Sequence, residues 1–105
     1  MLFCRNKGAV GRGQRTANGF VIYHASTAVL EERPSAENYP YVMAQRKQLI
    51  DEGVLIVKDG FWVFTKDAEF SSPSAAAVIH GGSANGLLAW KTEGGKSLKQ
   101  LDEQP

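Results

Sequence analysis

The residues best suited to chemistry in this sequence are basic side chains near its start. The first 24 residues hold four basic side chains and no acidic one, whereas residues 25–105 carry eight basic and eleven acidic side chains. Glycines are interleaved with the four cations, which are Arg5, Lys7, Arg12 and Arg15. Guanidinium groups and the main-chain amides of a glycine-rich loop both donate to phosphate. The pattern predicts an anionic partner, and the alternative is that the charges only solvate a loop.

Further polar residues could extend such a contact. Ser72 and Ser74 stand where a helix is expected to begin, so free amides there could hold an anion, although helix capping by Ser72 alone also explains the pattern. Asn85 and Trp90 could lie near bases, but Asn85 is better explained as a turn residue that tolerates positive φ. Arg46 is expected to be half-buried on a helix, with its head at the margin of the core.

Catalytic and metal chemistry find little support in the residue pattern. Cys4 has no activating partner nearby in the sequence and is expected to be a small apolar core residue. Two histidines, His24 and His80, do not make a metal site by themselves. The segment Gly8–Gly13 lacks the lysine of a phosphate-binding P-loop. We therefore expect no metal, no cofactor and no enzymatic activity.

Length and composition predict one small domain over residues 1–105, with a frayed tail at residues 102–105. A single cysteine excludes an internal disulfide. No apolar run reaches the roughly 20 residues of a membrane helix, and no secretory signal stands at the start. The expected location is the cytoplasm, with no membrane contact.

Local patterns predict strands and turns in the first half of the chain. Leu2–Arg5 is expected to be a strand, Lys7–Gly19 a glycine-rich loop, and Phe20–His24 a strand that is covered on both faces. A short strand is expected at Ala28–Leu30. Asp59-Gly60 predicts a type I′ hairpin that pairs Lys58 with Phe61 and Leu55 with Phe64.

Helices are expected at three places. One runs over Pro40–Glu52 and ends at Gly53, and one runs over Pro73–His80 after Ser72 and ends at Gly81. Ser97 and Gln100 form a capping box for a short helix at the C-terminus. Asn85-Gly86 is expected to turn the chain into a strand, Leu87–Lys91. These elements predict an α+β domain with a mostly antiparallel sheet, hairpins and two to three short helices; a winged-helix layout is the alternative.

One segment is specific enough to carry a resemblance. Residues Ser72–Leu98 read SPSAAAVIHGGSANGLLAWKTEGGKSL, and FCRNKGA, GFVIYHAS and RKQLIDEGVL stand upstream of them. This combination resembles a small domain of unknown function that is attached to GIY-YIG nucleases and to restriction–modification-associated proteins, and that is related to the RAMA domain. The resemblance spans about Phe3–Leu101.

The resemblance implies a DNA-associated accessory module rather than a nuclease, because the GIY and YIG strands are absent. DNA, with modified DNA left open, is the expected partner, together with a separately encoded nuclease or methylase. The predicted contact residues are Arg5, Lys7, Arg12, Arg15, Arg46, Ser72, Ser74, Asn85 and Trp90. The alternative function is a protein–protein adaptor that docks on a nuclease or methylase through exposed positions of the hairpin Val54–Phe64.

Overall fold

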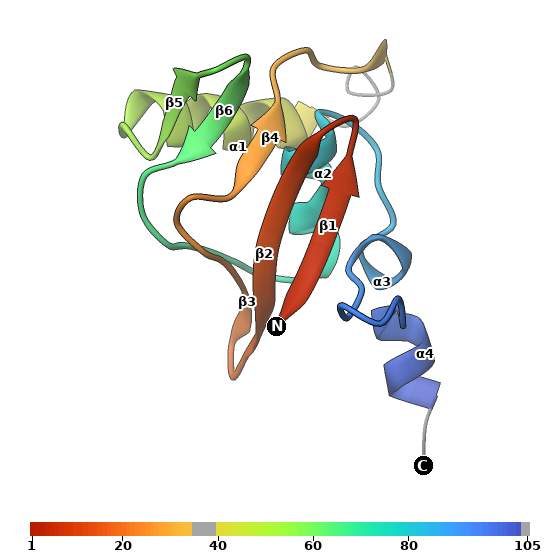
Figure 1. Ribbon diagram of the computed structural model, residues 1–105. Coiled ribbons are helices and arrows are strands. Elements are labelled where there is room, and N and C mark those ends of the chain that lie inside the picture. The colour runs from red at the N-terminus through yellow and green to blue at the C-terminus, as the bar shows by residue number, and fades with distance from the viewer. Residues whose placement is uncertain (35–39, 104–105) are drawn as a thin grey trace.

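Two antiparallel sheets flanked by short helices make up the part of the chain that the structure, a computed structural model, describes: residues 1–34 and 40–103 (Figure 1). The strands are β1 (Leu2–Asn6), β2 (Ala9–Thr16), β3 (Gly19–Ile22), β4 (Thr27–Val29), β5 (Leu55–Lys58), β6 (Phe61–Phe64) and β7 (Ala68–Phe70). The helices are α1 (Pro40–Asp51), α2 (Ala76–His80), α3 (Gly86–Ala89) and α4 (Leu98–Glu103), with a 3₁₀ turn, η2 (Pro73–Ala75), directly before α2.

The strands form one sheet in the order β1-β2-β3-β7 and a second in the order β4-β6-β5. Every pairing between these strands is antiparallel, which confirms the predicted α+β class. The helix followed by a hairpin that suggested a winged helix is present as α1, β5 and β6. The four-stranded sheet sets the fold apart from that alternative, because a winged-helix domain has no such second sheet.

The segment Lys7–Gly19 was wrongly predicted to be a loop, because eight of its residues form β2, between β1 and β3. A Cβ atom at Gly11 would lie 3.2 Å from the Trp90 ring, and one at Gly13 would lie 2.4 Å from the carbonyl oxygen of Val21. A side chain at Gly13 would clash with main chain, and one at Gly11 would require the Ile79 and Trp90 side chains to shift. The glycines therefore mark places where other parts of the chain cover the strand closely, which a local rule for loops does not anticipate.

The hairpin β5–β6 has the predicted register, with Lys58 opposite Phe61 and Leu55 opposite Phe64. Asp59 has φ 52° and Gly60 has φ 86°, the two positive values that a type I′ turn requires. The strand expected at Phe20–His24 is observed as β3, which lies between β2 and β7 in the first sheet. Its last three residues are buried, as predicted for a strand that is covered on both faces. The strand expected at Ala28–Leu30 is β4.

Helix ends follow the predicted capping residues. The hydroxyl of Ser72 accepts from the amide of Ser74 as η2 begins, and Gly81, with φ 72°, ends α2 in the left-handed conformation. Ser97 and Gln100 form the capping box of α4: the Ser97 amide donates to Oε1 of Gln100 at 2.9 Å, and the Gln100 amide donates to the Ser97 hydroxyl at 3.2 Å. Residues 102 and 103, expected in a frayed tail, belong to α4, and residues 104–105 lie outside the described ranges.

The strand predicted at Leu87–Lys91 is wrong, because residues 86–89 form α3. Asn85 is the N-cap of this helix: its φ is −84°, and its side-chain Oδ1 accepts from the Leu87 amide at 3.0 Å. The prediction of a turn residue with positive φ is therefore also wrong. Asparagine suits both a turn and an N-cap, so the sequence pattern did not separate the two.

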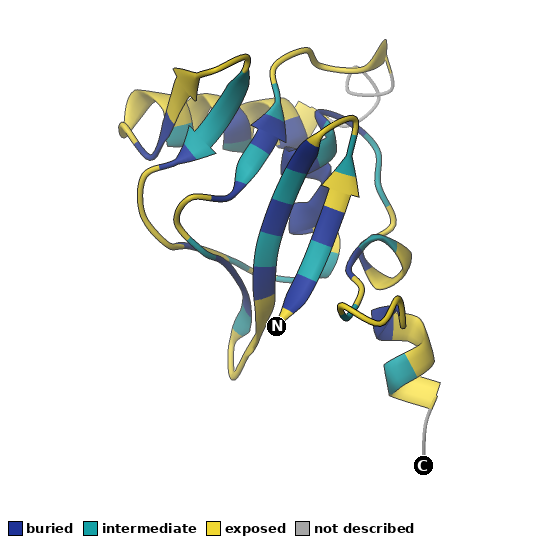
Figure 2. Ribbon diagram, viewed as in Figure 1, coloured by how far each residue is buried: buried dark blue, intermediate teal, exposed yellow. Residues whose placement is uncertain are grey.

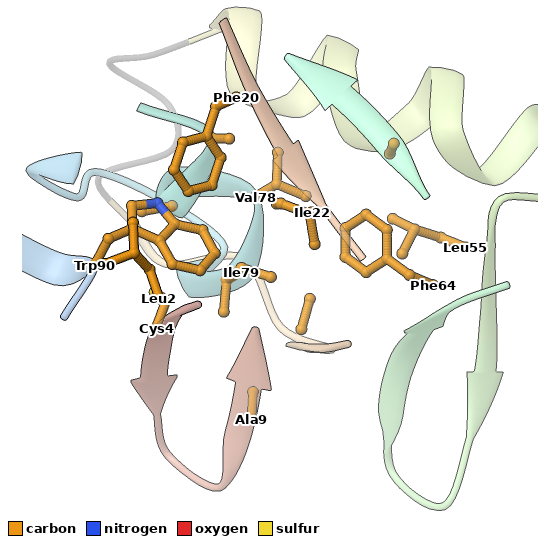
Figure 3. Packing of buried hydrophobic residues seen from close by; sticks show 14 of the residues in the cluster. Leu2, Cys4, Ala9, Phe20, Ile22, Leu55, Phe64, Val78, Ile79 and Trp90 are labelled. Carbon is orange, nitrogen blue, oxygen red and sulfur yellow. The ribbon is translucent and has the colours of Figure 1, made fainter. Parts of the chain in front are cut away.

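The core lies between the first sheet and α2, and it continues toward the second sheet (Figure 3). The rings of Phe20 and Trp90 pack with centroids 4.7 Å apart. Buried and more exposed residues alternate along β1 and through the first half of β2 (Figure 2), so one face of this hairpin lies on the core and the other faces outward. No helix within residues 1–34 or 40–103 is long and apolar enough to cross a bilayer.

Candidate functional site

Three side chains form a row across the outer face of the first sheet, the face directed away from α2. Phe3 pairs with Arg12 of β2 on one side and with Lys91, through an isolated antiparallel bridge, on the other. In that bridge the Phe3 amide donates to the Lys91 carbonyl oxygen at 2.7 Å, and the Lys91 amide donates to the Phe3 carbonyl oxygen at 2.9 Å. Because directly opposed residues of antiparallel strands project to the same face, the two cations flank the Phe3 ring.

Arg5 adds a third cation to this group. It lies two residues after Phe3 on β1 and therefore on the same face, and its guanidinium carbon lies 4.8 Å from the centroid of the Phe3 ring. This is a cation–π contact, which holds the guanidinium over the ring. We call Arg5, Arg12 and Lys91, together with Phe3, the basic face.

A cavity of about 400 Å³ opens beside β1 at the edge of the basic face. Its lining residues are Phe3, Arg5, His80, Ala89 and Lys91. Strand β1, the end of α2 and the end of α3 thus surround it. Two cations line this cavity and no carboxylate does, so its electrostatic potential favours an anion.

His80 lines the same cavity, and its Nε2 is buried in the protein beside it. Within the described part of the chain, His80 Nε2 and Asn6 Nδ2 are the buried side-chain nitrogen or oxygen atoms without a hydrogen-bond partner. Burial, and secondarily the charge of Arg33, lower the pKa of the His80 imidazole, which favours the neutral ring. A buried nitrogen without a partner is costly to the fold, and loss of the charge on the imidazole makes this cost smaller.

The guanidinium of Arg12 makes a hydrogen bond within the protein. Its Nη2 donates to the main-chain carbonyl oxygen of His24 at 2.7 Å. The carboxylate of Asp67 accepts from the His24 amide at 2.9 Å, and its Oδ1 lies 3.2 Å from His24 Nδ1. These bonds to His24, first the backbone one, and more weakly the charge of Arg12 lower the pKa of Asp67. Arg12 therefore lies near a carboxylate, unlike the residues that line the cavity.

Arg15 does not belong to the basic face. It lies on the opposite face of β2, because it shares the side of Gly11 and Gly13, and it binds Asp102 of α4 through both terminal nitrogens, at 2.6 and 2.9 Å. Lys7 lies in the turn between β1 and β2, with φ 48°. The structure thus brings Arg5 and Arg12 together on one face and separates Arg15 from them, whereas the sequence grouped all four cations.

Two of the predicted contact residues are inside the protein, so the prediction that they contact nucleic acid is corrected. Trp90 has 0% of its surface exposed, and its indole Nε1 donates to the carbonyl oxygen of Pro73. Arg46 has 1% exposed, where a half-buried side chain was predicted. Its guanidinium donates to the carbonyl oxygens of Val78, Val29 and Leu30. Both side chains are satisfied internally and offer no group to a ligand.

Ser72, Ser74 and Asn85 lie together around a hollow of about 420 Å³. Their polar groups are already used: Ser74 donates its amide to the Ser72 hydroxyl at 3.2 Å, the two hydroxyls lie 2.6 Å apart, and Asn85 caps α3. The amide of Ala75 donates to the Ser72 carbonyl oxygen at 3.1 Å. Neither amide expected to hold an anion is therefore free, and capping accounts for this cluster.

Two observations on residues 1–34 and 40–103 bear on metal binding and on thiol chemistry. That part of the chain holds no group of three or more His, Cys, Asp or Glu side chains placed to bind a metal ion. Cys4 is completely buried, and burial raises the pKa of its thiol to about 12. The thiol therefore stays protonated at neutral pH.

Sequence reasoning missed Phe3, His80 and Lys91 as members of the site. Phe3 and Arg5 alternate along a strand that was recognised, so their common face could have been found. Lys91 follows α3 and reaches the site only because the chain there pairs with β1. The sequence predicts His80 only as the last residue of a helix, and its position beside β1 carries no local signal.

The family model for the Domain of unknown function (DUF4357) matches residues 2–102. No curated protein and no solved structure matches the chain. The family's description states no activity, ligand or partner. The match therefore identifies the family, and a function has to be inferred from the geometry of the site. Since the match covers nearly the whole sequence and both sheets, the chain belongs to the DUF4357 family.

Proposed function

We propose that this domain binds the phosphate backbone of nucleic acid through the basic face. The observation that carries the proposal is the placement of Arg5 over the Phe3 ring and of Lys91 opposite Phe3, beside a cavity that no carboxylate lines. Arg12 extends the face across β2. Contacts to phosphate need cations at the surface and no particular base, so such a face suits binding that is independent of sequence.

The context of this binding is part of the same proposal. The segment Ser72–Leu98 resembles domains attached to GIY-YIG nucleases and to restriction–modification-associated proteins. We infer an accessory module in the cytoplasm that brings DNA, with or without base modification, to a separately encoded nuclease or methylase. In this proposal the domain itself catalyses no reaction, and its one thiol, which is buried and protonated, does not act as a nucleophile.

Binding is tested by fluorescence anisotropy with a labelled duplex at low salt. Three phosphate contacts give a slope of log K against log salt of about −2.7 on duplex DNA. R5A, R12A and K91A should each reduce the slope by about one. Matched duplexes with and without N6-methyladenine, and the single strands, show which form is preferred.

Two variants serve as matched controls. R15A removes an arginine from the opposite face, where it is paired with Asp102, and K47A removes a lysine of α1 that is paired with Asp51. Both should bind as the unchanged protein does. Absence of binding at low salt, or equal losses for R15A and R5A, would reject the basic face as the site.

A second candidate function, docking on a partner protein, is favoured by one observation. Ile56 and Val57 of the edge strand β5 expose 46% and 58% of their surface. An edge strand with exposed β-branched residues can pair with a strand of another protein. Retention of a nuclease or methylase from lysate after removal of DNA, with loss in I56K, supports docking; loss of the partner on DNA removal argues against it.

A further inference from the structure

The cavity beside β1 is lined by residues of three segments: β1, the end of α2, and the chain at and just after the end of α3. Phe3 and Lys91 close it on one side through their main-chain bridge, and His80 and Ala89 bound it from the helices. Its volume of about 400 Å³ is ample for one phosphate group with part of a sugar.

The charges of the lining match a dianion. Arg5 and Lys91 supply two positive charges, and the remaining lining residues are Phe3, Ala89 and His80, none of them acidic. A phosphomonoester carries between 1.5 and 2 negative charges at about pH 7 and presents three strongly accepting oxygens. A phosphodiester within a strand carries one charge, so the cavity complements a terminal phosphate better than an internal one.

Main-chain geometry adds another donor at this edge. The amide and carbonyl of Phe3 point away from β2, because they bond to Lys91. Main-chain groups alternate in direction along a strand, so those of Arg5, two residues later, also point away from β2. The register agrees, since the amide of Val10, opposite Arg5, is bonded to the Thr27 hydroxyl and not to β1. The Arg5 amide therefore projects toward the side where the cavity lies.

We propose that this cavity binds a phosphomonoester, the terminal phosphate of a nucleic-acid strand, through Arg5, Lys91 and the Arg5 amide. This inference rests on the proposed binding of nucleic acid and names the group that the cavity selects. The same chemistry would hold the phosphate of a free mononucleotide. His80 lines the wall of the cavity, and the Phe3 ring supports the Arg5 guanidinium.

Three labelled oligonucleotides of one sequence test the proposal: one with a 5′-phosphate, one with a 3′-phosphate and one with neither. We expect one phosphorylated strand to bind about tenfold more tightly than the unphosphorylated one, because it gains charge-assisted hydrogen bonds. R5A and K91A should abolish this ratio. H80L and H80Q, at a residue that lines the cavity without exposing Nε2, should change it less than R5A or K91A.

R12A is the control that separates this proposal from the proposed function. Arg12 lies on the basic face but does not line the cavity, so its loss should weaken all three oligonucleotides equally and leave the ratio unchanged. If no oligonucleotide binds, the proposed function has failed. If all three bind alike and R12A, R5A and K91A weaken them equally, only the terminal-phosphate pocket has failed.

Competition identifies the source of the phosphate. Adenosine monophosphate should displace the phosphorylated strand while adenosine does not, and equal displacement by the two would overturn the pocket. A monophosphate that binds as tightly as the strand would assign the pocket to free nucleotides instead of strand ends. In ¹⁵N-resolved NMR spectra, the Arg5 amide resonance should shift on addition of the monophosphate, and an unchanged Arg5 resonance would argue against the site.

Discussion

Trp90 donates from its indole Nε1 to the carbonyl oxygen of Pro73 across 3.0 Å, and no part of its surface is exposed. Gly86 approaches the same residue so closely that a Cβ there would lie 2.2 Å from the Pro73 carbonyl oxygen. The Ser-Pro-Ser, Asn-Gly and Trp parts of the segment Ser72–Leu98 thus meet at one point of the fold. Packing between these residues therefore accounts for their spacing in the sequence, without any role in binding a ligand.

This contact should be costly to remove. W90F keeps an aromatic ring but leaves the Pro73 carbonyl oxygen without its donor, so we expect the free energy of unfolding to fall by about 2 kcal/mol. G86A places a Cβ against main-chain atoms of Pro73 and should cost about 2–3 kcal/mol. L88A changes a side chain that is 49% exposed, so its free energy of unfolding should stay within about 0.5 kcal/mol of that of the unchanged protein. Urea titration of the three variants measures these differences.

Arg46 should be required for stability rather than for binding. Its buried guanidinium bonds to Val78 through Nε at 3.0 Å and Nη2 at 2.7 Å, and to Val29 at 2.6 Å. R46L leaves those carbonyl oxygens without donors, and R46K replaces a fork of donors by a single ammonium, so each should lower the free energy of unfolding by about 3 kcal/mol. K47A, at the neighbouring exposed position, is the control, and equal stability of K47A and R46K would contradict this account.

The two tightly covered glycines of β2 should respond differently to alanine. At Gly11 the new Cβ meets side-chain atoms of Ile79 and Trp90 at 3.0 to 3.2 Å, which can move by a few tenths of an ångström. At Gly13 it meets the carbonyl oxygen of Val21 at 2.4 Å, and this atom belongs to the paired strand β3. Thermal unfolding should therefore show a larger loss for G13A than for G11A, and the reverse order would be inconsistent with the packing described.

The Arg15–Asp102 ion pair should make the docking of α4 dependent on pH. Hydrogen bonding to Arg15 lowers the pKa of Asp102 below the ordinary 3.8. A carboxyl whose pKa is lower in the folded state stabilises the fold fully above its unfolded pKa, and that contribution is lost as the pH falls through the folded value. The protection factors of the α4 amides, which correct for the slower intrinsic exchange in acid, should fall on acidification below about pH 3.8, and D102N should show no such pH step.

Local rules were sufficient where the physics is local. Asp59-Gly60 fixed both the turn type and the register of β5–β6, because positive φ at two successive residues leaves few alternatives. The capping box of Ser97 and Gln100 and the glycine that ends α2 were likewise predictable, since each acts within one turn of a helix. Part of the candidate site was also accessible, because Arg5 stands on a predicted strand.

Tertiary packing decided the rest, because it sets what lies over each residue. The sequence pattern predicted Gly11 and Gly13 to be loop glycines, and only the structure shows that other residues pack against them in a strand. Asparagine suits a turn and a helix cap, and the structure, in which Gly86 packs on Pro73, shows Asn85 as a cap. The amino-acid order determined that the chain begins with four cations. Only the fold decided that Arg15 binds helix α4 on the opposite face and that Lys91, from the other end of the chain, lies beside Arg5. The reason is that strand alternation and long-range pairing, rather than distance in sequence, determine the face on which a side chain lies.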